Sequence, residues 1–161
     1  MKPDFVIFFD GGYKSPDLIA VGAVVCSAEG EHITESARWM GTGTSNEAEY
    51  KGLLHAIAMA NFVGARQPLF CSDSKLIVKQ VNRKWAVKGH LCFLHGRCTG
   101  LLMEFDRWLL SHVPREKNKR ADWIVSTKLG HARATKKPPP IDLIELDEHE
   151  GWAGWSELAK A

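Results

Sequence analysis

The sequence has few of the features that mark secreted, membrane-bound or strongly charged proteins. Only four of its 161 residues are cysteine, too few for a disulfide scaffold and suited to a reducing cytosol. No apolar run approaches the roughly 20 residues of a membrane-spanning helix. Asp4 and Asp10 bracket the first apolar run, so no signal-peptide pattern opens the chain. The formal net charge of +2 is too small to indicate a partner by itself. We therefore expect a cytoplasmic protein that does not contact a membrane.

Most of the chain is expected to form one domain, because 161 residues with 45% hydrophobic side chains suffice for one core. The composition changes after Gly130, and the three prolines at 138–140 cannot continue a helix. An acidic run and three large apolar side chains at three-residue spacing follow. These side chains are Trp152, Trp155 and Leu158. We expect a domain over residues 1–137 and a C-terminal extension over 138–161 that is docked at least in part.

Short apolar runs and segments with helical periodicity alternate along the chain, and turn residues bound them. The expected strands are 4–9, 19–28, 31–40, 68–72 and 106–113. The expected helices are 46–63, 74–81, 91–104 and 121–130. This order predicts an α/β fold with a mixed five-stranded sheet, three antiparallel strands followed by parallel ones, covered by helices.

Four acidic residues lie at boundaries of these expected elements. They are Asp10, Glu49, Asp73 and Asp122. Two would end strands, with Gly11-Gly12 stopping the first strand, and two would begin helices, the first of them capped by Ser45-Asn46. Carboxylates at such positions can converge on one edge of a sheet. Converging carboxylates repel one another unless cations lie between them, and hard divalent cations prefer oxygen ligands.

Each acid taken alone also has an ordinary structural explanation. Asp10 could be a turn residue, and Glu49 could interact with the macrodipole of a helix. Asp73 could cap a helix with Ser74, and Asp122 could be a first-turn acid. The set of four is more informative than any one of them, because their order and local sequence follow a known pattern.

Four segments carry that pattern. They are Phe9-Asp10-Gly11-Gly12, Thr44-Ser45-Asn46-Glu47-Ala48-Glu49-Tyr50, Ser72-Asp73-Ser74-Lys75 and His112-Val113-Pro114-Arg115-Glu116-Lys117-Asn118-Lys119-Arg120-Ala121-Asp122. Over residues 4–130 the sequence resembles type 1 ribonuclease H, especially its compact variety from archaea, some bacteria and plant proteins. The resemblance implies the ribonuclease H-like fold and an endonuclease that hydrolyses the RNA strand of RNA–DNA hybrids.

The resemblance also implies a metal site built from the four acids, with two Mg²⁺ ions and Mn²⁺ as a substitute. It implies that Asp10 and Asp122 hold the metal that activates water, and that Asp10, Glu49 and Asp73 hold the other. Two metals can clamp the attacking and leaving oxygens of an in-line displacement. His112 lies ten residues before Asp122, where the family often has a mobile loop histidine. It would transfer a proton or assist product release, or it is simply an exposed histidine.

Candidate substrate-binding residues follow from the same segments. Gly11 and Gly12 would let the backbone approach the RNA strand. Thr44 and Asn46, at a helix start, would hold a DNA phosphate or touch the minor groove, although Asn46 could also be a plain cap.

Basic side chains recur every four residues at Lys75, Lys79 and Arg83. Such a stripe is a candidate phosphate track, although basic helical stripes are often only solvated surfaces. We expect an RNA–DNA hybrid as partner and a monomer without an obligatory protein partner.

Two other functions remain open from the sequence. A 3′–5′ exonuclease or a resolvase could share the broad fold, but such exonucleases usually carry a second acid where this chain has Gly12. A non-catalytic nucleic-acid binding module is the other alternative, and the intact set of four acids argues against it.

Overall fold

The computed structural model describes residues 2–15, 17–131 and 137–141, so Trp152, Trp155 and Leu158 lie outside the described residues. The strands are β1 (Phe5–Lys14), β2 (Leu18–Ser27), β3 (His32–Thr42), β4 (Leu69–Ser72) and β5 (Leu109–His112). The helices are α1 (Ser45–Phe62), α2 (Lys75–Val81), α3 (Leu91–Leu102), the 3₁₀ helix η1 (Arg115–Lys117) and α4 (Lys119–Leu129). Within the described residues no helix is both long and apolar enough to span a membrane.

The five strands form one mixed sheet in the order β3-β2-β1-β4-β5. β1 pairs antiparallel with β2, and β2 pairs antiparallel with β3, whereas β1, β4 and β5 are parallel. The predicted fold class is therefore confirmed. Phe8 of β1 pairs with Cys71 of β4, so Asp10 in β1 and Asp73, the residue after β4, each lie two residues beyond that pair. The topology thus brings both acids to the same region of the sheet.

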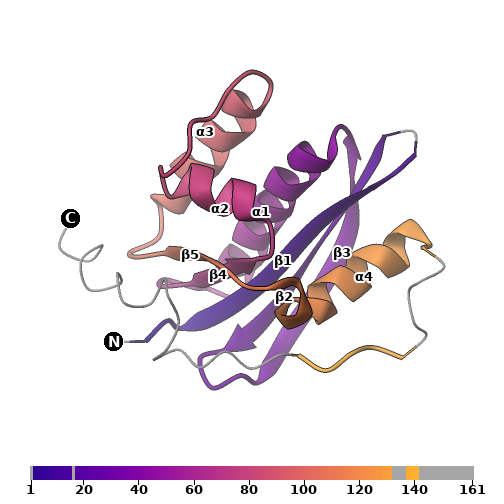
Figure 1. The fold of residues 1–161 in the computed structure, drawn as a ribbon. Helices are drawn as coiled ribbons and strands as arrows, with labels where there is room; N and C mark the ends of the chain where they lie inside the picture. Colours follow the sequence, from indigo (N-terminus) through magenta and orange to yellow (C-terminus); the bar gives the residue numbers. More distant parts are fainter. Residues whose placement is uncertain (1, 16, 132–136, 142–161) are drawn as a thin grey trace.

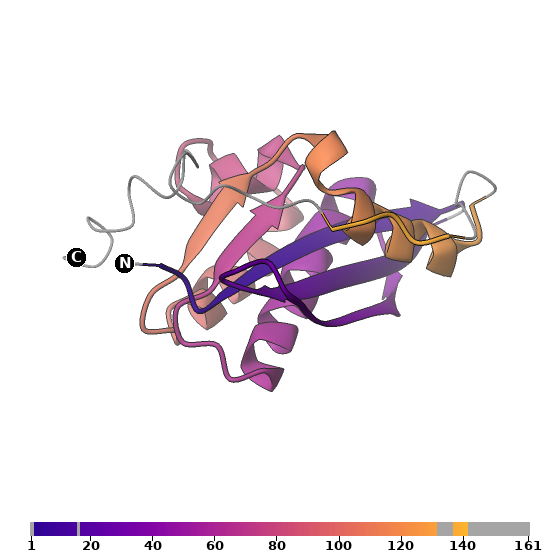
Figure 2. The same cartoon turned by 90° about the horizontal axis from the view of Figure 1, so that it is seen from below.

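Helices cover both faces of the sheet, and this explains the continuous apolar run in β1. Successive strand residues point to opposite faces. Ile7 and Phe9 belong to the core under α1, α2 and α3, whereas Val6 and Phe8 belong to the core under α4. Figures 1 and 2 show α4 on the face opposite α1. A strand that is buried on both faces needs apolar residues at every position.

The first strand is longer than the sequence predicts. β1 continues to Lys14, because Gly11 pairs with Val21 and Gly12 pairs with Ala20 in β2. The prediction that Gly11-Gly12 stops the strand was wrong, and Asp10 lies inside β1. Long-range pairing with β2 overrides the weak strand preference of glycine.

The N-terminus of α1 also differs from the prediction. Thr44 caps the helix by accepting a hydrogen bond from the Glu47 backbone N–H at 3.2 Å, and the Glu47 carboxylate accepts one from the Thr44 backbone N–H at 3.0 Å. This reciprocal pair is a capping box. The predicted cap at Ser45-Asn46 was wrong, and Glu49 lies in the second turn of α1.

Other boundaries shift by a few residues. β5 begins at Leu109 rather than 106, and α4 begins at Lys119 rather than 121. Residues 139 and 141 contact the core side of α4 and its neighbours. Arg120 Nη1 donates a hydrogen bond to the Pro139 carbonyl at 2.9 Å, and Ile141 packs against the core under α4. Figure 1 shows this segment passing beside α4.

Candidate active site

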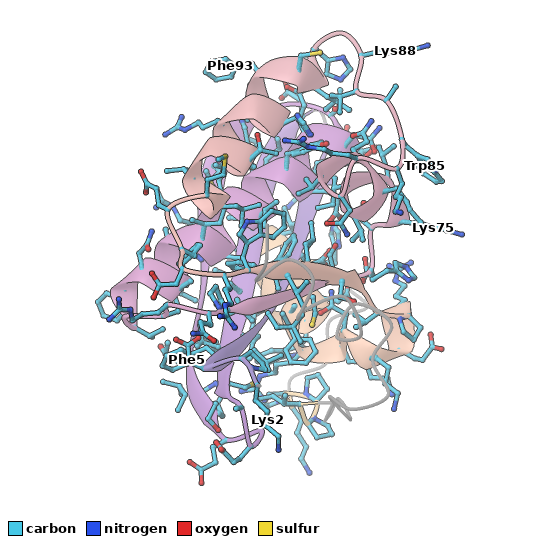
Figure 3. The ribbon with its side chains drawn as sticks, turned by 90° about the vertical axis from the view of Figure 1, so that its left-hand side faces the viewer. Lys2, Phe5, Lys75, Trp85, Lys88 and Phe93 are labelled. Carbon is cyan, nitrogen blue, oxygen red and sulfur yellow. The ribbon has the colours of Figure 1, made fainter. Side chains whose placement is uncertain are left out.

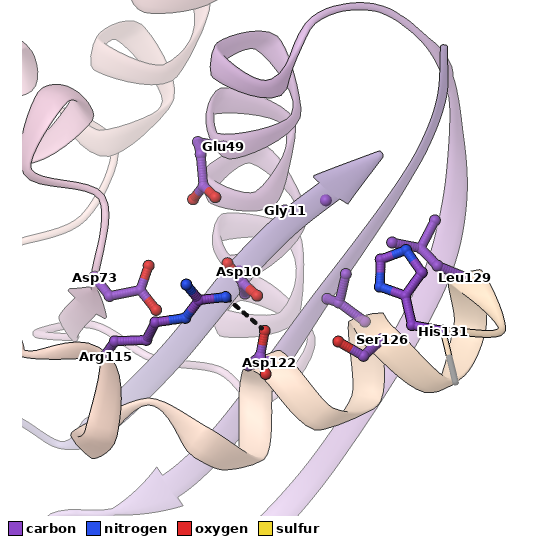
Figure 4. Close-up of a pocket in the computed structure, with 11 residues that line it drawn as sticks. Asp10, Gly11, Glu49, Asp73, Arg115, Asp122, Ser126, Leu129 and His131 are labelled. Carbon is purple, nitrogen blue, oxygen red and sulfur yellow. Dashed lines mark ion pairs between the residues drawn. The ribbon is translucent and has the colours of Figure 1, made fainter. Parts of the chain in front are cut away.

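One pocket of about 300 Å³ is lined by all four acids that the sequence singles out. Asp10 comes from β1, Glu49 from α1, Asp73 from the residue after β4, and Asp122 from the first turn of α4. Figure 4 shows their carboxylates pointing into the same space. The four acids that share this pocket thus lie up to 112 positions apart in the sequence (Asp10 to Asp122).

Three of the four acids form a tight group. Asp10, Glu49 and Asp73 each offer a carboxylate oxygen, and these oxygens lie within 4.8 Å of one another. Asp122 lines the same pocket outside this group, and its Oδ1 lies 4.0 Å from Nη2 of Arg115. The site therefore consists of a cluster of three carboxylates and a fourth carboxylate, Asp122, that faces the guanidinium group of Arg115.

Glycines bring β1 and α1 into backbone contact at the site. A Cβ atom on Gly11 would lie 2.0 Å from the Ala48 carbonyl oxygen, and one on Gly52 would lie 2.9 Å from the Asp10 carbonyl oxygen. Both distances are far below contact distance, so neither position accepts a side chain without a backbone shift. This close approach places Glu49 beside Asp10. It gives Gly11 a packing role independent of any substrate contact.

Burial and mutual repulsion disfavour the charged forms of these acids. Asp10 is 7% exposed. Burial raises its pKa well above the ordinary value, and the charges of Asp73 and Asp122 raise it further. Burial and the Asp10 charge likewise raise the pKa of Glu49. The pKa of Asp73 is raised by burial, while the hydrogen bond from Asn118 and the Arg115 charge oppose that rise.

The site fits a hard divalent cation. Among the described residues, Glu49 Oε2 is buried and has no hydrogen-bond partner. An unpaired buried carboxylate oxygen is costly, and a cation among three carboxylates would remove both this cost and the repulsion. All the available ligands are oxygen atoms, which suits Mg²⁺ better than softer metals.

Asn118 connects the strands of the site, a role that its position before a helix did not reveal. Its side chain is buried, and Nδ2 donates to the Phe9 carbonyl at 3.0 Å and to Asp73 Oδ2 at 3.3 Å. The side chain does not cap α4. Asn118 instead fixes the position of Asp73 relative to β1.

The pocket lining also includes residues that sequence reasoning missed. Arg115 and His131 both line the pocket. Arg115 lies inside the fourth motif segment, seven residues before Asp122, and a cation so close in sequence to one of the four acids was a usable signal. His131 follows the glycine that ends α4, and nothing in the local sequence indicated that it lines the same pocket as the acids.

The predicted proton-transfer residue, His112, is exposed at the end of β5 and pairs in register with Ser72. It does not line the carboxylate pocket. It lies near enough to Asp73 for its charge to lower the pKa of that acid slightly. Thr44 and Asn46 are exposed at the start of α1, where the Thr44 hydroxyl is already engaged as the cap.

The predicted basic stripe does not continue along one helix. Lys75 and Lys79 lie on α2, but α2 ends at Val81 and Arg83 has a left-handed φ of 63°. The prediction that Arg83 extends the helical stripe was therefore wrong. Figure 3 shows Lys75 and Trp85 projecting outward on the same side of the molecule.

Comparisons with known proteins agree with this architecture. Residues 8–128 match the family described as reverse transcriptase-like. The crystal structure of RNase H1 from the archaeon Halobacterium salinarum superposes with a TM-score of 0.76 at 33% identity, covering 80% of this chain and 98% of that one. The chain belongs to the type 1 ribonuclease H family. The family prediction is thus confirmed.

Two further relatives show how this ribonuclease H domain occurs elsewhere. The bifunctional protein Rv2228c of Mycobacterium tuberculosis is 33% identical over 156 residues, and the chain spans 92% of its own length but only 43% of that protein. LC11-RNase H1, solved in complex with an RNA/DNA hybrid, has a TM-score of 0.73 at 29% identity, covering 80% of this chain and 98% of that one.

Proposed function

We propose that this ribonuclease H domain is an endonuclease that hydrolyses the RNA strand of RNA–DNA hybrids with divalent metal ions. The observation that carries this proposal is the cluster of Asp10, Glu49 and Asp73, whose oxygens lie within 4.8 Å. A structural relative was solved with an RNA/DNA hybrid, which supports the same substrate class for this chain.

The proposed cofactor is a pair of Mg²⁺ ions, for which Mn²⁺ can substitute. Asp10, Glu49 and Asp73 would hold one ion, and Asp10 and Asp122 the other. When bound, the ions supply an activated water and a stabilised leaving oxygen. The chain's own residues set the arrangement: the contact of Gly11 with α1 places Glu49, and Asn118 holds Asp73.

Two side chains beside the acids would act on the substrate. Arg115, 4.0 Å from Asp122, would pair with a phosphate oxygen of the substrate and offset the negative charge of the pocket. His112, exposed beside Ser72 and near Asp73, would take up or deliver a proton at the edge of the site. It would need to turn toward the substrate, because it does not line the pocket in this structure.

The remaining substrate contacts surround the pocket. The backbone of Gly11 and Gly12 would approach the RNA strand, where 2′-hydroxyl groups distinguish RNA from DNA. The exposed Thr44 and Asn46 would face a phosphate at the start of α1, and Lys75 and Lys79 would attract the nucleic-acid backbone.

We further propose that the protein works in the cytosol as a monomer. Its four cysteines are free thiols, which fits a reducing compartment.

The test is hybrid cleavage by four conservative variants: Asp10→Asn, Glu49→Gln, Asp73→Asn and Asp122→Asn. Each should remain folded by circular dichroism and lose at least about a hundredfold in rate, because each removes one charged ligand. The matched control is Asp17→Asn, an exposed acid away from the pocket, which should keep full activity. Full activity of the Asp10 variant would refute the proposal.

A further inference from the structure

The carboxylate pocket has two chemically different ends. Asp73 and Glu49 lie at one end, and His131 and Leu129 at the C-terminus of α4 lie at the other (Figure 4). Gly12 also lines the pocket, next to Leu129 and Val125. The family assignment and the metal cluster account for the acidic end. They leave the end that carries His131 without a function.

The backbone fixes His131 at this rim. Gly130 ends α4 with a left-handed φ of 73°, and the His131 N–H donates to the Ser126 carbonyl at 3.0 Å. This glycine-terminated end turns the chain back toward β1. A residue other than glycine would be strained at position 130, so the turn that presents His131 is built into the sequence.

Lys14 brings a second basic group to the same place. It is the last residue of β1, and its Nζ lies only 3.8 Å from the point that a Cβ on Gly130 would occupy. Lys14 is exposed, and within residues 2–15, 17–131 and 137–141 neither Lys14 nor His131 has an ion-pair partner. The carbonyl groups at the end of α4 favour a cation here.

Gly12 lets β1 run close against α4 in the lining of this pocket. A Cβ at this position would lie 3.0 Å from Leu129 Cδ1 and 3.1 Å from Val125 Cγ1. A side chain at this position would press on Leu129 and Val125, so β1 can pass this close to α4 because the residue is glycine. Since the acids and His131 line the same pocket, a strand bound at the acids can extend along it to His131.

We propose that Lys14 and His131 form a phosphate subsite that binds the RNA strand one or more nucleotides away from the bond at the acids. This inference rests on the proposed function. A pocket of four acids repels a polyanionic strand, so the Lys14 ammonium and an imidazole N–H donor of His131 at its rim would offset that repulsion. The ligand is an RNA-strand phosphodiester, because the strand that reaches the acids is the one that can extend along the same pocket to His131.

Binding, rather than cleavage, tests this subsite. In an Asp10→Asn background, which should bind without cutting, the dissociation constant of a short RNA–DNA hybrid is measured over a range of salt concentrations. Lys14→Ala and His131→Ala should each weaken binding about two- to fivefold, the range expected for one exposed charged contact. Lys14→Ala should also reduce the salt slope by about one.

Lys128→Ala is the matched control. Lys128 is exposed on α4 like a typical surface lysine, but it faces the groove beside β3 rather than the carboxylate pocket. Its removal changes the net charge by the same amount as Lys14→Ala. Binding and salt slope should stay close to those of the Asp10→Asn parent if position, and not total charge, decides the effect.

Neutral methylphosphonates at single positions identify the phosphate. The Asp10→Asn parent should bind the hybrid more weakly when one particular RNA-strand phosphate beside the cleavage site is neutralised. The Lys14→Ala/His131→Ala double variant in the same background should show no further loss of affinity from that neutralised phosphate. Equal binding by the double variant and Lys128→Ala would overturn the subsite, as would an effect confined to DNA-strand phosphates. Cleavage of the hybrid by the wild-type protein is scored separately, so a failed subsite and a failed function are distinguishable.

Discussion

Replacing Asp10 by asparagine should stabilise the metal-free protein while it abolishes activity. The Asp10 oxygen lies within 4.8 Å of oxygens of Glu49 and Asp73. At an effective dielectric constant of about 20, two unit charges at that separation repel by about 3 kcal/mol. Because raised pKa values let these acids share protons, the net gain is smaller, about 1–3 kcal/mol. For a domain of this size, that gain corresponds to a rise in melting temperature of about 3–10 °C.

The pH dependence supplies a second readout. When folding raises the pKa of an acid, that acid stabilises the fold at pH values below its pKa in the unfolded chain. This stabilisation is lost as the pH rises through its pKa in the folded protein. In EDTA, the wild-type protein should therefore lose stability as pH rises above about 4, and Asp10→Asn should lose less.

Thermal unfolding in EDTA at several pH values measures both effects, with Asp17→Asn as the exposed control. Added Mg²⁺ should stabilise the wild-type protein more than the variant, because the variant lacks a ligand. A variant that melts below the wild-type protein in EDTA, with an unchanged pH profile, would refute the idea that the acids repel one another.

Three further predictions concern other parts of the chain. His55 is buried with Nε2 2.9 Å from Ser36 Oγ, and burial lowers its pKa from 6.5, so the protein should lose stability as the pH drops below about 6.5. Melting curves between pH 5 and 7 should show a smaller loss for His55→Gln than for the wild-type protein. Arg120 donates hydrogen bonds to Glu35 and to the Pro139 carbonyl, so Arg120→Ala should lower the free energy of unfolding in urea by about 1–3 kcal/mol. The control Arg83→Ala, at an exposed position, should lower it by less than about 0.5 kcal/mol. Reversing Lys75 and Lys79 to Glu should raise KM more than it lowers kcat and flatten the salt dependence of hybrid binding, and an unchanged slope would mean that these lysines are only solvated surface.

The sequence predicted the order and type of the elements because the signals were local. The apolar runs of β1 and β4 and the periodicity of α1 are readable without knowledge of their partners. The length of β1 was not readable, because Gly11 and Gly12 join the strand only through pairing with Val21 and Ala20. From the sequence alone, a pair of glycines predicts the end of a strand, because the strand that pairs with them is not known.

The four acids were predictable because each lies in a recognisable local segment. The resemblance also implied that Asp10, Glu49 and Asp73 form one ligand set. The contacts that shape the site were not predictable, because the approach of Gly11 to α1 and the position of Arg115 opposite Asp122 arise only in the folded chain. Asn118 illustrates the same limit. Nothing in its local sequence connects it with Asp73, because only the tertiary fold brings its side chain to that acid.

The most direct test of the central claim is one cleavage reaction on a hybrid whose RNA and DNA strands carry different end labels. In Mg²⁺, the wild-type protein should produce internal cuts in the RNA strand and leave the DNA strand intact. EDTA should stop the reaction, and Asp10→Asn should show no cuts. Cutting of the DNA strand, release of single terminal nucleotides only, or undiminished cutting in EDTA would contradict a metal-dependent endonuclease specific for the RNA strand.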